Sequence, residues 1–145
     1  MTQPADPSPT LSLDGQPVAL LPDETILACA RRNGVHVPTL CEMADIDHAP
    51  GTCRVCLVEI DAPGGPQLVA SCVTPAQAGM NVRTRTRRVR EAQRLQVELL
   101  LADPTPHCAT CVPHGNCAAQ DAAQFVGAGR AGGPEFLGLA RELLE

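Results

Sequence analysis

Four cysteines in the first half of the chain have the residue type and spacing of a metal-binding set. The set follows the pattern C-x11-C-x2-C-x15-C and consists of Cys41, Cys53, Cys56 and Cys72. Two bridged irons need four thiolates in one compact pocket and backbone N–H donors around the sulfides, and a wrapping loop supplies both. Gly51 permits the close backbone approach of such a loop. A zinc site of four thiolates also uses C-x2-C pairs and is the alternative.

Composition limits the classes of protein that the chain can represent. The segment "MTQPADPSPT" has neither a positive n-region nor an apolar h-region, so we expect no signal peptide, and no apolar run approaches the ~20 residues of a membrane span. We therefore expect a cytoplasmic location, where clustered cysteines are metal ligands or redox centres rather than a disulfide framework. The net charge of −5 gives no support for nucleic-acid binding. Phe125 and Phe136 are the two aromatic residues, so the core is aliphatic and a metal would help to hold it.

Hydrophobic periodicity predicts the elements that must position the cysteines. Asp14-Gly15 joins two alternating runs and predicts a hairpin. A short helix follows, with Asp23 as its N-cap and Gly34 as its stop. Strands are expected at 57–60, 67–73 and 80–84, the second of which contains Cys72. From Thr84 the period changes to that of a helix of roughly eighteen residues.

These elements predict an α+β chain with three parts. Residues 1–9 are rich in proline and are expected to be a disordered lead-in. Residues 10–84 form a β-rich domain, and residues 85–145 form a helical domain with the remaining cysteine motif and a short terminal helix. Cys29 falls on the first helix, outside the four-cysteine motif, and is expected to be a small buried apolar residue.

Three stretches resemble a family of redox proteins: "TILACARRNGVHVPTLC", "GTCRVCLVEI" and "LVASCVTPAQAGMNVRT". They look like the N-terminal ferredoxin domain of the complex I large iron–sulfur subunit and of the diaphorase small subunit of NAD-reducing hydrogenases. The same domain occurs in iron-only hydrogenases and NAD-linked formate dehydrogenases. The resemblance covers about residues 11–84 and implies a β-grasp fold. It also implies a 2Fe–2S cluster on Cys41, Cys53, Cys56 and Cys72.

A second cysteine motif resembles the same families, in which a small helical segment binds a 4Fe–4S cluster. The motif is C-x2-C-x5-C and consists of Cys108, Cys111 and Cys117. In the family a histidine four residues before the first cysteine is the fourth ligand, but Pro104 stands there in this chain. His107 is the first candidate to replace it, although neighbouring side chains usually diverge. The alternatives are His114, Asp103, an external or missing ligand, or a degenerate site that holds zinc or nothing.

The chain is interpreted as an electron-transfer component without substrate chemistry of its own, since no nucleophile–base pair or phosphate-binding loop stands out. The resemblance implies that it relays single electrons between a flavin subunit that handles NAD(H) and a catalytic subunit of hydrogenase or formate dehydrogenase type. A free ferredoxin shuttle and a zinc-binding interaction module are the alternatives. Six arginines between 83 and 94 are interpreted as the solvated face of a helix, with a docking patch as the alternative.

Overall fold

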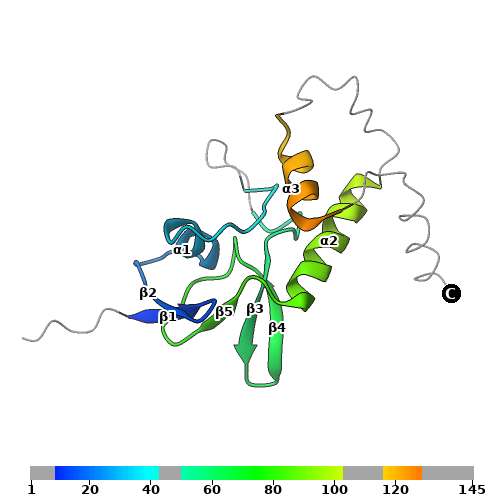
Figure 1. Cartoon of the computed structure of the whole chain (residues 1–145). Helices are drawn as coiled ribbons and strands as arrows, with labels where there is room; N and C mark the ends of the chain where they lie inside the picture. The colour runs from blue at the N-terminus through cyan, green and yellow to red at the C-terminus, as the bar shows by residue number, and fades with distance from the viewer. Residues whose placement is uncertain (1–8, 43–49, 103–115, 129–145) are drawn as a thin grey trace, which may run out of the picture. The chain divides into compact units, whose positions relative to one another are not determined.

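The computed structural model describes residues 9–42, 50–102 and 116–128 (Figure 1). Its elements are β1 (Thr10–Leu13), β2 (Gln16–Ala19), α1 (Ile26–Arg32), β3 (Leu57–Ala62), β4 (Gly65–Ala70), β5 (Asn81–Arg83), α2 (Arg87–Leu101) and α3 (Ala118–Val126). The chain divides into two compact units. The sheet unit comprises residues 1–37 and 56–89, and the helical unit comprises residues 38–55 and 90–145.

The sheet unit contains one mixed sheet with the strand order β2-β1-β5-β3-β4 (Figure 1). β1 and β5 are parallel, and the other neighbouring strands are antiparallel. Helix α1 contributes Ile26, Leu27 and Ala30 to a hydrophobic core with Leu11 and Val82 of the sheet. A mixed sheet that buries one helix face is the α+β, β-grasp arrangement expected from the sequence.

The β1–β2 hairpin forms where the sequence predicts it. Asp14 and Gly15 both have positive φ, 49° and 83°, as a two-residue hairpin turn requires. The Asp14 carboxylate also accepts hydrogen bonds from the backbone N–H of Thr84 at 2.7 Å and from its hydroxyl at 2.5 Å. The turn residue therefore also anchors the chain just after β5.

The expected N-cap of α1 is wrong by two residues. Thr25 is the N-cap, and its Oγ1 accepts a hydrogen bond from the backbone N–H of Ala28 at 3.2 Å. Asp23 instead has a left-handed φ of 57° in the turn before the helix. At the other end Gly34, with φ 72°, follows the C-cap and stops the helix as expected.

Cys72 does not lie in a strand, contrary to expectation. β4 ends at Ala70, and Cys72 lies in the turn that follows. The apolar run "LVASCV" predicts a longer strand, but the chain turns after Ser71, where the N–H groups of Val73 and Thr74 donate to the Ala70 carbonyl. A turn places Cys72 at the end of the β3–β4 hairpin rather than along it.

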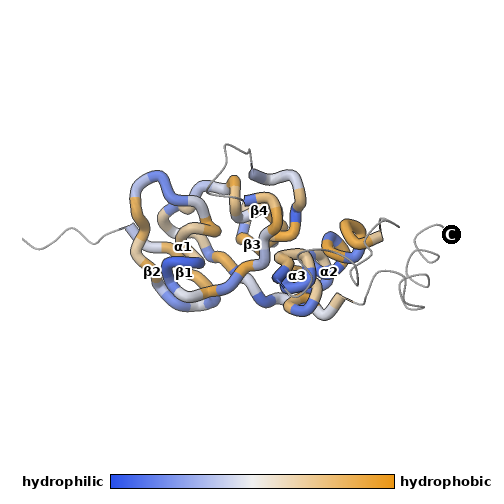
Figure 2. The backbone as a smooth tube through the Cα atoms, turned by 90° about the horizontal axis from the view of Figure 1, so that it is seen from above, coloured by the Kyte–Doolittle hydropathy of each residue, from blue (hydrophilic) through white to orange (hydrophobic). Residues whose placement is uncertain are grey.

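The helical unit has a separate, smaller core. Its buried members are Val55, Val97 and Ala122, and Leu40 and Cys53 pack against them. In Figure 2 the tube alternates between hydrophobic and hydrophilic colour along α2, as expected for a helix with one buried face. α2 begins three residues later than the sequence suggests because Thr86 caps it, accepting from the N–H of Val89 at 3.2 Å. Among the described helices, none has the length and apolar character of a membrane span.

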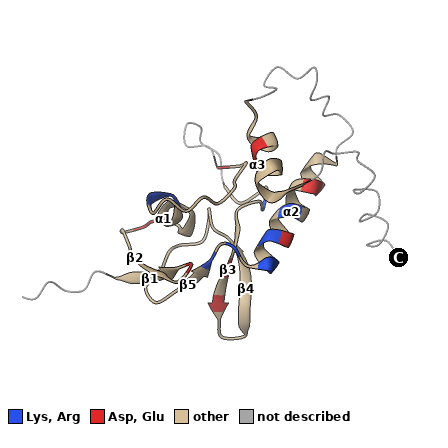
Figure 3. Ribbon diagram, viewed as in Figure 1, with Lys and Arg blue, Asp and Glu red and all other residues tan. Residues whose placement is uncertain are grey.

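The arginine run is more than a solvated helix face (Figure 3). Arg83 forms ion pairs with Glu59, at 3.0 Å, and with Asp61. Arg88 donates to the carbonyl of Pro66 at 2.7 Å, and Arg94 pairs with Glu98 at 2.6 Å. Arg87 also has an interaction partner, so most of the six arginines are more than solvated charges. Arg88 joins the start of α2 to the β3–β4 hairpin, and Arg83 joins β5 to β3.

Candidate metal centre

Cys41 lies in the helical unit in surroundings that favour a thiolate. Its Sγ accepts a hydrogen bond from the backbone N–H of Gly51 at 3.3 Å. Gly51 has a φ of 100°, which residues other than glycine rarely adopt. In this backbone conformation its N–H points to the sulfur of Cys41. Burial alone would raise the pKa of the Cys41 thiol. Donors on Cys53, Gly51 and Thr52 outweigh burial and lower this pKa to about 6.

Cys53 is held in the same unit by packing. Its half-buried side chain lies against the core that contains Val55 and Val97. The next residue, Arg54, has a left-handed φ of 55° and an exposed side chain. The loop therefore turns sharply between the two cysteines of the C-x2-C pair, and it does so at a residue that is not glycine.

Cys56 and Cys72 lie in the sheet unit and are both buried. The carbonyl of Cys56 accepts two hydrogen bonds from Ser71, one from its backbone N–H at 3.0 Å and one from its hydroxyl at 2.8 Å. Ser71 is fully buried and directly precedes Cys72. These bonds fasten the start of β3 to the turn that carries Cys72, so the sheet unit holds this pair of cysteines on a rigid hairpin end.

The structure thus shows the four cysteines as two pairs, one in each unit. None of the four is in a disulfide, and neither are the other described cysteines, Cys29 and Cys117. Within the described ranges, no group of three or more His, Cys, Asp or Glu side chains is arranged to hold a metal ion. The complete four-sulfur ligand set therefore stays a prediction from the sequence.

Thr39 was not identified from the sequence, and it has an unusual position two residues before Cys41. Its Oγ1 is buried and has no hydrogen-bond partner in the described part of the chain. A buried hydroxyl without a partner costs about 1–3 kcal/mol. The thiolate-favouring surroundings of Cys41 and the spare hydroxyl of Thr39 fit an iron–sulfur cluster, whose sulfur atoms accept hydrogen bonds.

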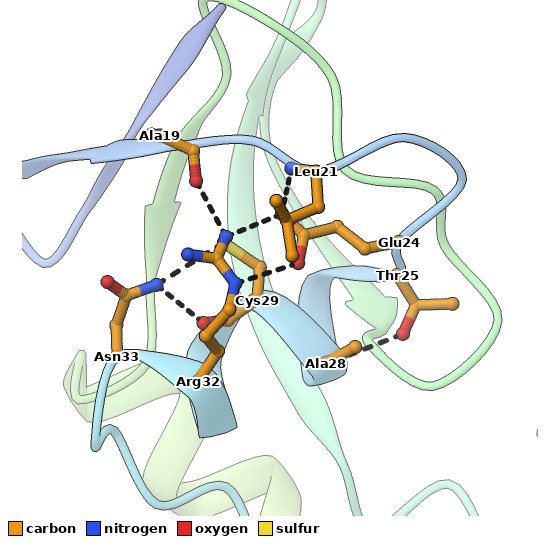
Figure 4. A network of polar contacts seen from close by, with 8 residues as sticks. All are labelled: Ala19, Leu21, Glu24, Thr25, Ala28, Cys29, Arg32 and Asn33. Carbon is orange, nitrogen blue, oxygen red and sulfur yellow. Dashed lines mark hydrogen bonds and ion pairs between the residues drawn. The ribbon is translucent and has the colours of Figure 1, made fainter. Parts of the chain in front are cut away.

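Cys29 is buried on α1, as expected, in the same hydrophobic core as Cys56 and Cys72, and its polar neighbours are shown in Figure 4. Its sulfur lies 3.9 Å from Arg32 Nη2 and 3.8 Å from Asn33 Nδ2. Arg32 in turn pairs with Glu24 at 2.8 Å and donates to the Ala19 carbonyl at 2.6 Å. Burial raises the pKa of the Cys29 thiol, with the nearby Glu24 carboxylate as the next cause. This thiol stays protonated and structural.

The second cysteine motif is described only at its last member. Cys117 is half-buried and is the N-cap of α3, with extended backbone angles. A helix N-terminus stabilises a thiolate, which suits a metal ligand. The other candidates for this site, His107, Cys108, Cys111, His114 and Asp103, lie outside the described residues.

The chain belongs to the family of 2Fe-2S iron-sulfur cluster binding domains, whose model matches residues 8–87. The match contains Cys41, Cys53, Cys56 and Cys72 and covers the sheet unit. Membership agrees with the β-grasp sheet and with the thiolate-favouring loop around Cys41. The chain is therefore assigned to the class of 2Fe–2S domain proteins.

Particular relatives are large redox subunits. The chain is 36% identical to the NADP-reducing hydrogenase subunit HndD of Solidesulfovibrio fructosivorans, with 81% of this chain and 20% of that protein covered. It is 33% identical to the mitochondrial NADH-ubiquinone oxidoreductase 78 kDa subunit of Candida albicans, with 88% of this chain and 17% of that subunit covered. It is 31% identical to the NADPH-Fe(3+) oxidoreductase subunit alpha of Geobacter sulfurreducens, with 83% of this chain and 14% of that subunit covered. The chain therefore spans a fifth or less of these curated relatives.

A solved structure shares the fold. The crystal structure of NAD+-reducing [NiFe]-hydrogenase in the H2-reduced state contains a chain that superimposes with a TM-score of 0.76 at 29% sequence identity. The similarity covers 87% of this chain and 52% of the hydrogenase chain. It thus extends beyond residues 8–87, the span of the family match.

Proposed function

We propose that the chain is an iron–sulfur electron-transfer subunit of a multisubunit NAD(P)-linked oxidoreductase. The observation that carries the proposal is the family match over residues 8–87, which includes four free cysteines at the motif spacing. A 2Fe–2S cluster, when bound, accepts and gives up single electrons. The relatives are subunits of hydrogenase, NADH-ubiquinone and NADPH-Fe(3+) oxidoreductases, which supports a relay role.

Cys41, Cys53, Cys56 and Cys72 are the proposed ligands. A binuclear site needs four thiolates, two for each iron, and the motif supplies these four. Around Cys41, the chain's own N–H and hydroxyl donors stabilise negative charge on sulfur. Around Cys56, the bonds from Ser71 fix the backbone. The protein's part is to hold, orient and shield the cluster.

The ligand assignment is tested by substitution with a matched control. Full-length protein carrying Cys56→Ser is expected to lose its iron, its sulfide and the electron paramagnetic resonance signal of the reduced cluster. Cys29→Ser is the control, because Cys29 is equally buried in the same unit but lies outside the motif. Zinc in place of iron and sulfide in the wild-type protein would contradict the electron-transfer role and favour the zinc module.

We further propose a 4Fe–4S cluster on Cys108, Cys111 and Cys117, with His107 as the fourth ligand. Support comes from the C-x2-C-x5-C spacing and from the position of Cys117 at the start of α3. The test is low-temperature electron paramagnetic resonance of the fully reduced wild type and of His107→Ala. A second signal that His107→Ala leaves unchanged rejects His107, and a single signal in the wild type rejects this cluster.

The proposed partners are a flavin subunit that handles NAD(H) and a catalytic subunit of hydrogenase or formate dehydrogenase type, in the cytoplasm. The relatives are themselves named as subunits of oxidoreductases, which supports partners of this kind. Gentle purification from the native host is expected to recover these subunits with the chain. Recovery as a stable monomer that reduces several unrelated acceptors would instead identify a ferredoxin shuttle.

A further inference from the structure

The hydroxyl of Thr39 requires an acceptor that the described part of the chain does not provide. Other buried hydroxyls there are satisfied: Ser71 Oγ donates to the Cys56 carbonyl at 2.8 Å, and Thr84 Oγ1 donates to Asp14 at 2.5 Å. Thr39 Oγ1 is buried without such a partner. Native proteins rarely leave a buried hydroxyl unpaired, so each such group calls for an explanation.

The surroundings of Thr39 within the helical unit explain the lack of an acceptor. Pro38 is buried, and Leu40 packs against the apolar core of this unit. Cys41 comes next after Leu40, and its Cα lies at most about 7 Å from the Thr39 Cα because the two residues are two positions apart. The polar groups gathered at Cys41, on Gly51, Thr52 and Cys53, all act as donors there.

We propose that Thr39 Oγ1 donates a hydrogen bond to a sulfur atom of the bound 2Fe–2S cluster and thereby raises its reduction potential. The inference rests on the proposed function, since it needs a cluster beside Cys41. One-electron reduction adds one negative charge and makes or breaks no bond; the electron comes from the flavin subunit in the complex. A hydrogen bond to sulfur stabilises the more negative state, so reduction becomes easier. Thr39 is a tuning residue rather than a ligand.

The experiment measures the reduction potential of full-length holoprotein by redox titration with dithionite, followed by electron paramagnetic resonance. Thr39→Val has the same shape without the hydroxyl and is expected to have a more negative potential than the wild type. Thr39→Ser keeps the hydroxyl and is expected to stay close to the wild type. After exchange into D2O, the wild type and Thr39→Ser should show an exchangeable proton coupled to the cluster that Thr39→Val lacks.

Thr74→Val is the matched control. Thr74 lies two residues after Cys72, as Thr39 lies two residues before Cys41, but its hydroxyl already donates to the Ala70 carbonyl at 2.8 Å. Its replacement should lower stability and leave the potential unchanged. Thr74→Val therefore shows what the loss of a threonine hydroxyl near a proposed ligand does when that hydroxyl already has an acceptor in the chain. A shift of the potential in Thr39→Val alone is then due to the hydroxyl that lacks such an acceptor.

Two results would overturn the inference. A Thr39→Val protein with the wild-type potential shows that the hydroxyl has another partner, such as water. A Thr39→Ser protein that shifts as far as Thr39→Val shows that packing, not the hydroxyl, sets the potential. In both cases the cluster assembles and the proposed function stands. A wild-type protein that assembles no 2Fe–2S cluster overturns the proposed function together with the inference.

Discussion

Arg54 combines an unfavourable backbone conformation with a useful charge. Its φ of 55° lies in the left-handed region, which costs a residue with a side chain roughly 1–2 kcal/mol. Its guanidinium is exposed, and among the described residues it has no ion-pair or hydrogen-bond partner. A cation between Cys53 and Cys56 favours the extra negative charge of a reduced cluster. This charge therefore explains why an arginine occupies position 54, although glycine would adopt the left-handed φ there with less strain.

Arg54→Gly is expected to stabilise the holoprotein by about 0.5–1 kcal/mol, because glycine adopts the left-handed conformation without strain. The same change is expected to make the reduction potential more negative. Chemical denaturation and redox titration measure the two effects. Arg54→Lys is the control, since it keeps both the charge and the strain. A potential that does not move in Arg54→Gly would show that the charge is screened by solvent.

Gly51 positions the N–H that bonds to Cys41 Sγ. Gly51→Ala is expected to cost about 1–2 kcal/mol, because alanine is strained at φ 100°. It should also reduce the iron and sulfide content, since the N–H moves away from the sulfur. Gly64→Ala is the control: a Cβ there meets nothing within 4 Å, and its φ is not in the left-handed region. Equal metal content in the two variants would contradict this role of Gly51.

At the scale of elements, α1 is tied to the loop before it by a carboxylate–guanidinium pair (Figure 4). Glu24 Oε1 accepts from Arg32 Nη2 and from the backbone N–H of Leu21 at 2.7 Å. The Arg32 hydrogen bond is the largest cause that lowers the pKa of Glu24, partly opposed by burial. The pair joins the N-terminal side of α1 to its last turn, over Cys29.

This lowered pKa predicts an acid-sensitive element. The unfolded state binds a proton at Glu24 more readily than the folded state, so stability rises with pH between the lowered pKa and the ordinary one. The contribution is fully present above the ordinary carboxylate range and is lost as pH falls through the folded pKa. Glu24→Gln should therefore be less stable than the wild type at pH 7, and the difference should shrink in acid. Denaturation midpoints at several pH values measure it.

Asp23→Asn is the control for this titration. Asp23 precedes Glu24, is exposed, and has no side-chain partner among the described residues. Asparagine tolerates its φ of 57°. A constant difference between wild type and Glu24→Gln across the acid range would show that the pair acts through packing and not through charge.

Local patterns determine which elements could be predicted from the sequence. Asp14-Gly15 requires two positive φ angles, so the hairpin was predictable from two residues. The end of β4 was not, because the N–H groups of Val73 and Thr74 turn back to the Ala70 carbonyl within an apolar run that contains no glycine or proline. The four proposed ligand cysteines rest on spacing and resemblance and stay a prediction. The unpaired hydroxyl of Thr39 results from burial in the folded chain, and the φ of Arg54 results from closure of its loop. Neither feature could be predicted from the sequence pattern.

At the scale of the whole molecule, the division of residues between units also escaped the sequence. Residues 38–55 group with the helical unit because Leu40, Cys53 and Val55 pack with Val97 and Ala122, more than forty positions later in the chain. Periodicity reports on neighbours within one element and carries no signal of such packing. The domain boundaries expected at residues 9, 84 and 145 stay predictions.

Removing the cluster should therefore destabilise the whole chain. The sheet-unit core has no aromatic residue and includes the proposed ligands Cys56 and Cys72, while Phe125 is 52% exposed. A group bound only by the folded state adds about 4 kcal/mol when present at a thousand times its Kd. Anaerobic removal of iron with a chelator should lower the unfolding midpoint substantially, and reconstitution with iron and sulfide should restore it. As a control, Cys29→Ser should show the same difference in unfolding midpoint between the protein with its cluster and the protein without it. Equal midpoints for the wild type with and without the cluster would show that the aliphatic cores stabilise the fold without metal.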